Sequence, residues 1–117
     1  MVVELTIGKV PSLNAFYSSK HWVVRKKARD KFHAEIMEQL QKMQHITFEQ
    51  CQIEAWVNYR YDLDNCIMAI KFSTDAFREW GGIPDDSPKY IKAISINYDP
   101  TLPKDTAKIF FTRVLQD

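Results

Sequence analysis

The spacing of apolar residues changes repeatedly along this 117-residue chain, and the order of the changes limits the folds that it can adopt. Apolar residues alternate with polar ones, as in a strand, in residues 2–7, 50–61, 90–98 and 107–115. They recur every three or four residues, as in a helix, in residues 22–43 and 64–80. Gly81-Gly82 ends the second helical pattern, and residues 8–20 are expected to form a loop. The predicted order of elements is β-α-β-α-β-β.

Four strands and two helices in this order most simply form a two-layer α+β (α/β) fold. We expect a four-stranded mixed sheet with both helices on one face. No internal repeat, low-complexity tract or linker rich in Pro, Gly or Ser divides the chain, so residues 1–117 are expected to form a single domain. The apolar and charged fractions, 45% and 26%, are those of an ordinary globular protein.

The sequence predicts a cytoplasmic protein. No apolar run approaches the roughly 20 residues that span a bilayer, and Met1-Val2-Val3-Glu4 does not begin a signal peptide. Cys51 and Cys66 form no C-x-x-C pair, so two free thiols in a reducing compartment are expected, with one disulfide as the alternative. The three histidines and these cysteines have no zinc-site spacing, and no glycine-rich phosphate loop is present.

Charge is divided unevenly along the chain. Residues 1–45 hold eight Lys/Arg against four Asp/Glu, a net charge of +4, whereas residues 46–100 hold five against nine, a net charge of −4. A basic first part and an acidic middle suit a molecule that holds a polyanion at one surface and a cation at another.

The acidic residues of the middle part form an ordered set: Asp62-Leu63-Asp64-Asn65 before the second helix, Asp75 within it, and Asp85-Asp86 after it. Closing this strand–helix–strand unit could bring Asp62, Asp64 and Asp86 to one end of a sheet. Two carboxylates about 4 Å apart repel by roughly 4 kcal/mol at an effective dielectric near 20. Three such groups would therefore need a hard divalent cation such as Mg²⁺ to stay together.

Each of these acidic motifs also has a purely structural interpretation. Asp62 or Asp64 could cap the second helix, and Asp85-Asp86-Ser87-Pro88 could be only a turn. Lys71 and Asp75 stand at i and i+4 and could be a surface ion pair. At 100° per residue, Asp64, Met68, Lys71 and Asp75 share one flank of the helix, about 100° from an apolar stripe.

The ordered set resembles the RusA family of Holliday-junction resolvases. The matching residues are Pro11, Asn14 and Tyr17 in the first loop, Asp62-Leu63-Asp64-Asn65, Lys71, Asp75-Ala76-Phe77 and Asp85-Asp86-Ser87. The resemblance implies an endonuclease that uses Mg²⁺, with Mn²⁺ as a substitute, and acts as a homodimer on branched DNA. It implies Asp62, Asp64 and Asp86 as metal-binding and catalytic acids, with Asp85 as the alternative third ligand, and Lys71 as the catalytic lysine. The family's lysine usually stands one turn earlier, where this chain has Met68.

Basic and aromatic residues gather where the first helix begins. Lysines and arginines there oppose the helix dipole, a cost of about 0.3–1 kcal/mol each that a bound phosphate would reverse. The aromatic rings could stack on bases that a branch point exposes. We therefore predict a DNA-binding set made of Asn14, Tyr17, Lys20, Trp22, Arg25, Lys26, Lys27 and Arg29. The alternative is a solvated helix face over buried aromatic rings.

The predicted function is hydrolysis of paired phosphodiesters in four-way DNA junctions during recombination and repair, by a protein encoded by a bacterium or a phage. One alternative is a non-catalytic module of the same fold that binds branched DNA. A small phosphatase of the haloacid-dehalogenase type also uses D-x-D, a lysine and a D-D pair, but its D-x-D follows an apolar strand near the chain start. The strand before Asp62 is late and polar.

Overall fold

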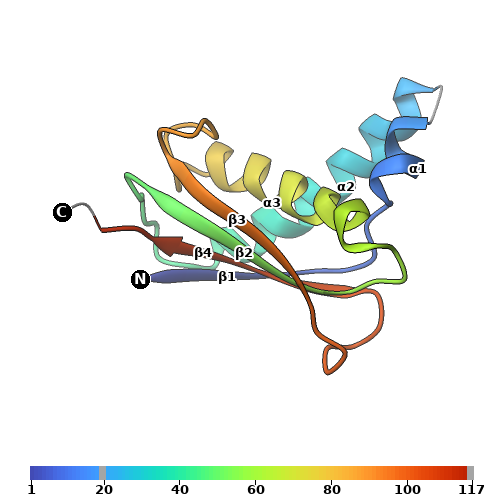
Figure 1. Ribbon diagram of the computed structural model, residues 1–117. Helices are drawn as coiled ribbons and strands as arrows, with labels where there is room; N and C mark the ends of the chain where they lie inside the picture. The colour runs from blue at the N-terminus through green and yellow to red at the C-terminus, as the bar shows by residue number, and fades with distance from the viewer. Residues whose placement is uncertain (19–20, 116–117) are drawn as a thin grey trace.

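The computed structural model describes residues 1–18 and 21–115 and confirms the predicted α+β fold with a four-stranded mixed sheet (Figure 1). The strands are β1 (Val2–Ile7), β2 (Cys51–Asn58), β3 (Ile91–Tyr98) and β4 (Thr106–Arg113), and they lie in the order β1-β4-β2-β3. Strand β4 is antiparallel to both β1 and β2, whereas β2 and β3 are parallel. The parallel pair follows from the helix between them, because a crossover helix returns the chain to the end at which β2 began.

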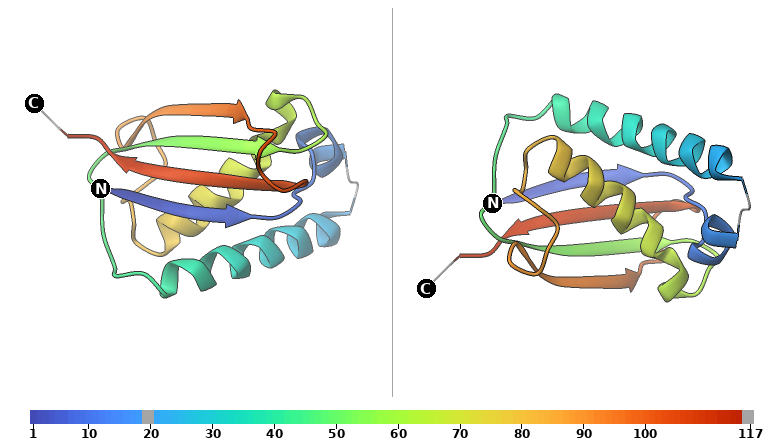
Figure 2. Two further views of the ribbon diagram at one scale, coloured as in Figure 1. Left: turned by 90° about the horizontal axis from the view of Figure 1, so that it is seen from below. Right: turned by 90° about the horizontal axis from the view of Figure 1, so that it is seen from above.

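Two helices, α2 (Trp22–Gln41) and α3 (Ile67–Glu79), lie on one face of the sheet, as predicted (Figure 2). Helix α2 contacts β1, and α3 crosses the sheet diagonally with its N-terminal end close to β3. No helix in residues 1–18 or 21–115 is long and apolar enough to cross a membrane.

Two short elements differ from the sequence prediction. The loop expected at residues 8–20 contains a helix, α1 (Leu13–Ser18), whose start is capped by Ser12 Oγ accepting the Ala15 N–H at 3.1 Å. The second helix was expected from Asp64, but residues Leu63–Cys66 form a 3₁₀ turn, η1, before α3 begins at Ile67. Periodicity could not separate these elements because each is only one or two turns long.

The core lies between the helices and the sheet. Alternate residues of β2 point into it, and Ile53, Ala55 and Val57 are fully buried. The Phe77 ring of α3 stacks on Phe111 of β4 with centroids 4.1 Å apart. The helices leave part of β3 uncovered. Ile94 and Tyr98 of β3 are 51% and 56% exposed. They nevertheless lie on the same face of the sheet as their buried partners in β2, Ile53 and Val57.

The glycine pair ends α3, as predicted. Gly81 has φ of +90°, a left-handed conformation that favours glycine, and its N–H donates to the Arg78 carbonyl. A Cβ on Gly82 would lie 2.4 Å from the Phe77 ring, so only glycine lets the chain turn this close to the core. The turn directs Asp85 and Asp86 back over the sheet toward β3.

Candidate phosphate- and cation-binding cavity

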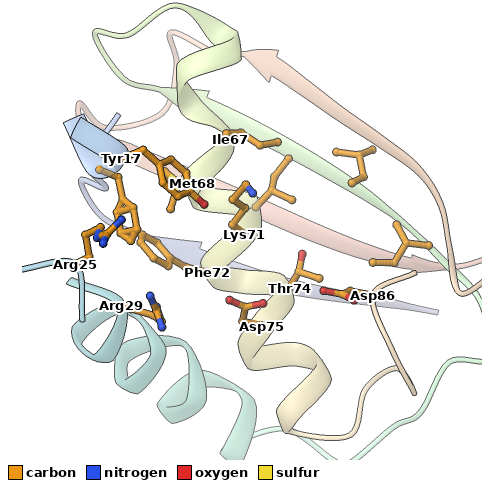
Figure 3. Close-up of a pocket in the computed structure, with 14 residues that line it drawn as sticks. Tyr17, Arg25, Arg29, Ile67, Met68, Lys71, Phe72, Thr74, Asp75 and Asp86 are labelled. Atoms are coloured by element: carbon orange, nitrogen blue, oxygen red, sulfur yellow. The ribbon is translucent and has the colours of Figure 1, made fainter. Parts of the chain in front are cut away.

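An open cavity of about 400 Å³ lies over the flank of α3 (Figure 3). Its walls come from α1, α2, α3, the loop after α3 and β3. The lining residues are Phe16, Tyr17, Arg25, Arg29, Ile67, Met68, Ile70, Lys71, Phe72, Thr74, Asp75, Asp86, Ile91 and Ile94. Five residues of the sequence-predicted site are therefore brought together here: Tyr17, Arg25, Arg29, Lys71 and Asp86.

The cationic part of the cavity comes from α2 and α3. Arg25 and Arg29 stand one turn apart on α2, and the Lys71 Nζ lies 5.9 Å from the centre of the Tyr17 ring. Phe16 packs edge-on against Phe72, with centroids 5.6 Å apart, and this contact fixes α1 at the cavity wall. The Tyr17 side chain is 55% exposed and remains accessible to a ligand.

The acidic part consists of Asp75 and Asp86. Arg78 reaches both acids of the loop, with nitrogen–oxygen distances of 3.8 Å to Asp85 and 3.9 Å to Asp86. Of these two acids only Asp86 lines the cavity, which makes it the better placed of the two alternative ligands. The Thr74 Oγ1 also lies at the cavity wall, buried and with no hydrogen-bond partner among the described residues.

Asp62 and Asp64 lie elsewhere, and the expectation that they would meet Asp86 at one end of the sheet is corrected. The two residues follow the C-terminal end of β2, whereas Asp86 precedes the N-terminal end of β3. In the parallel register Cys51 pairs with Ile91 and Val57 with Tyr98, so these two points are at opposite ends of the sheet. Helix α3, 13 residues or about 20 Å long, separates them. Within residues 1–18 and 21–115, no three His, Cys, Asp or Glu side chains are grouped to hold a metal ion.

The D-x-D-N segment is held locally by its backbone and by Asn65. The Asp62 carbonyl accepts the Asn65 N–H at 2.9 Å, and Asn65 Oδ1 accepts the Asn14 N–H at 3.3 Å, which ties α1 to η1. Asp62 occupies the N-cap position of η1 without a side-chain capping bond, so its carboxylate does not act as the predicted helix cap.

Burial raises the pKa of the Cys66 thiol, and the nearby carboxylates of Asp64 and Asp62 raise this pKa further. Cys51 and Cys66 are both buried free thiols.

Met68 and Lys71 are the two positions that matter for the predicted catalytic lysine, because the family's lysine usually stands where this chain has Met68. Met68 is 2% exposed, so the position at which the family has its lysine is filled by a core side chain. Lys71 is exposed and lines the cavity together with Asp75 on the next turn. The lysine therefore lies on the same flank of α3 as Asp75.

The rest of the predicted DNA-binding set is more scattered. Trp22 is 65% exposed at the start of α2, and Lys26 is bound to Asp30 at 2.7 Å. Lys26 and Lys27 are exposed outside the cavity lining, and Lys20 lies outside the described residues. Sequence reasoning missed three lining residues: Thr74, Ile91 and Ile94. Helical spacing set Thr74 on the side of the second helix that faces the sheet, and the strand pattern of residues 90–98 does not mark Ile91 or Ile94 as lining a site.

Comparison with protein-family models and with curated proteins finds no match for this chain. The resemblance to the RusA family therefore stays a prediction that the geometry of the cavity has to support.

Proposed function

We propose that this chain is a metal-dependent endonuclease of the RusA type that cuts four-way DNA junctions in the cytoplasm during recombination or repair. One observation carries the proposal: Arg25, Arg29 and Lys71 line the same cavity as Asp75 and Asp86. Phosphodiester hydrolysis needs cations that stabilise the charge on the phosphate, together with carboxylates that hold a metal ion.

The cationic residues would bind the DNA backbone. Arg25 and Arg29 present guanidinium groups that match phosphate oxygens. Tyr17 would stack against a base beside the bound phosphate. Lys71, which lines the same cavity, would stabilise charge on the reacting phosphate.

A single chain supplies only part of the ligand set predicted for Mg²⁺. Asp86 lines the cavity, and the orphaned Thr74 hydroxyl is a further hard oxygen donor there. The other two predicted ligands, Asp62 and Asp64, lie beyond the far end of α3. In one chain alone, the three predicted ligands are therefore too far apart to bind the same ion.

A cleavage assay tests the function. Four-way junctions and linear duplexes of matched sequence are incubated with the protein, with Mg²⁺, with Mn²⁺ and with EDTA. We expect paired cuts in the junction alone, dependent on metal, and a large loss of rate in Lys71→Ala. Lys104→Ala, which removes a cation from the exposed β3–β4 loop, is the matched control and should cut normally. Cleavage that is unchanged in Lys71→Ala would exclude the role assigned to that lysine.

A second function is supported by the separation of the acids: a module that binds branched DNA without cutting it. Such a module would bind DNA with the same cationic side of the cavity and would lack only the metal-dependent cleavage step. Tight binding of the junction with no cleavage in either metal, at any protein concentration, would favour this function over the nuclease.

A further inference from the structure

The face of the sheet that points away from the helices carries aromatic and charged side chains. Alternate residues of each strand point to this face, because their neighbours in the strand point into the core. No helix of residues 1–18 or 21–115 lies over it, as the left view of Figure 2 shows. We call it the open face, and its centre consists of Glu4, Glu54, Trp56, Lys108 and Phe110.

A row of three side chains crosses this centre. In the antiparallel register, Phe110 of β4 lies directly opposite Glu4 of β1 and directly opposite Glu54 of β2. Neighbouring strands are about 4.8 Å apart, so the two acids stand on either side of the ring, on strands about 10 Å apart. Neither glutamate forms an ion pair within the described part of the chain. The two negative charges beside Phe110 are therefore available to a cation from outside.

Trp56 lies next to this row and is oriented by it. Its Nε1–H donates to Glu54 Oε1 at 2.6 Å, and the other carboxylate oxygen of Glu54 has no hydrogen bond among the described residues. Trp56 is half-buried, so part of its ring remains accessible. Lys108 is its direct neighbour on β4, yet no lysine of residues 1–18 or 21–115 lies over the Trp56 ring. The ring and the carboxylate beside it therefore both lack an internal cation.

We propose that the open face docks a short arginine-bearing segment of another protein, with its guanidinium group stacked on Trp56 and bound by the carboxylates of Glu54 and Glu4. Arginine fits this arrangement better than lysine. Its planar guanidinium group stacks on an aromatic ring and can at the same time donate two hydrogen bonds to a carboxylate.

Charge and area favour this occupant over the alternatives. The centre of the open face has two carboxylates against one lysine, which disfavours the phosphates of a nucleic acid. Four strands of six to eight residues give a flat area of about 20 Å by 25 Å, or roughly 500 Å². A stable dimer buries about 800 Å² on each partner, so the face suits a short segment better than a second copy.

Docking at the open face would not compete with DNA. The cavity lies on the helix side of the sheet, between α1, α2, α3 and β3, whereas the open face is the opposite side. A partner can therefore hold the protein while the cavity is occupied. The proposal does not depend on the nuclease function, and a chain that cuts no DNA would leave it standing.

Titration with small probes, followed by the ¹H–¹⁵N signals of the indole groups, tests the docking chemistry. The probes are a blocked tetrapeptide with two central arginines, the same peptide with two lysines, and a single-stranded oligothymidylate. The chain has three tryptophans, and the Trp56 signal is the one missing in Trp56→Phe. We expect the arginine peptide to shift this signal saturably and the lysine peptide to bind about two- to fivefold more weakly, because it loses the stacking.

Matched variants test the carboxylates. Glu54→Gln removes the charge but keeps an oxygen that accepts the Trp56 N–H. It should weaken binding of the arginine peptide about tenfold, as expected for the loss of a hydrogen bond to a charged group. Glu35→Gln removes an exposed charge from α2 and should bind the peptide as the wild type does. Unchanged signals of Trp22 and Trp80, which belong to the helical layer, show that each variant is folded.

Four results would overturn the proposal. The first is a Trp56 signal that the arginine peptide does not shift, and the second is an equal affinity in Glu54→Gln and the wild type. Binding of oligothymidylate at Trp56 more tightly than the arginine peptide would assign the open face to single-stranded DNA instead. A Trp56 signal that moves with protein concentration alone would assign it to a second copy.

Discussion

Replacing Arg25 and Arg29 together by glutamine should weaken junction binding in a way that depends on salt. Both side chains line the cavity, and no ion pair with an acid is found for either among the described residues, so their charges are free to meet phosphate. Glutamine keeps much of the length and the polarity of arginine but removes its charge. The change therefore tests charge, with little effect on packing.

The expected magnitude follows from counterion release. Each phosphate contact contributes about −0.9 to the slope of log affinity against log salt. For each copy bound, losing two contacts should make the slope less negative by about 1.8. At 0.1 M salt the affinity should fall roughly eightfold per contact, or about 60-fold for the two contacts of one copy.

The assay is fluorescence anisotropy of a labelled four-way junction in EDTA, between 50 and 300 mM KCl. Two matched controls remove cations outside the cavity: Lys26→Gln, whose amine is already bound to Asp30, and Lys104→Gln on the β3–β4 loop. Both should change the slope by much less than the double variant. An unchanged slope in the arginine variant, or an equal change in Lys104→Gln, would refute the assignment of the cavity as the phosphate site.

Three further predictions concern stability. Phe77→Ala should lower the free energy of unfolding by about 3–5 kcal/mol in urea, because a fully buried, stacked ring is replaced by a cavity. Gln39→Ala should cost about 1–3 kcal/mol and promote aggregation seen by light scattering, since it uncovers the Thr6 backbone groups at the β1 edge. Burial raises the pKa of the Cys51 thiol from 9.0 to about 11, so folding favours the neutral thiol; the free energy of unfolding should therefore be unaffected below pH 9 and fall between pH 9 and 11. Urea titrations over this range should show a smaller fall in Cys51→Ala.

The fold was predictable because the apolar spacing of the long elements is strong and is bounded by clear signals. Residues Cys51–Asn58 alternate over eight positions, and the glycine pair after α3 has both the left-handed φ and the close contact that favour glycine. The short α1 was not predictable from periodicity, because its six residues bury only Phe16. Its helix depends on Ser12 as a cap and on tertiary packing against Phe72.

Which charged residues line the cavity could be predicted only in part. Of the four residues that the helix wheel set on one flank, Lys71 and Asp75 do line the cavity together, because positions four apart on a helix are neighbours whatever the tertiary fold. The other two differ: Asp64 lies in η1, before α3 begins, and Met68 is buried. The distance from Asp64 to Asp86 depends instead on whether β2 and β3 run parallel, and on which end of the sheet the connecting helix leaves and reaches. The strand–helix–strand order favours a parallel pair, and a parallel pair puts these two segments at opposite ends of the sheet.

The parallel pair of β2 and β3 therefore has a consequence for function that the motif alone does not show. A strand, a helix and a parallel strand necessarily place the segment after the first strand and the segment before the second at opposite ends of the unit. Within one chain, Asp62 and Asp64 therefore lie far from Asp86, whereas Asp75 lines the same cavity as Asp86.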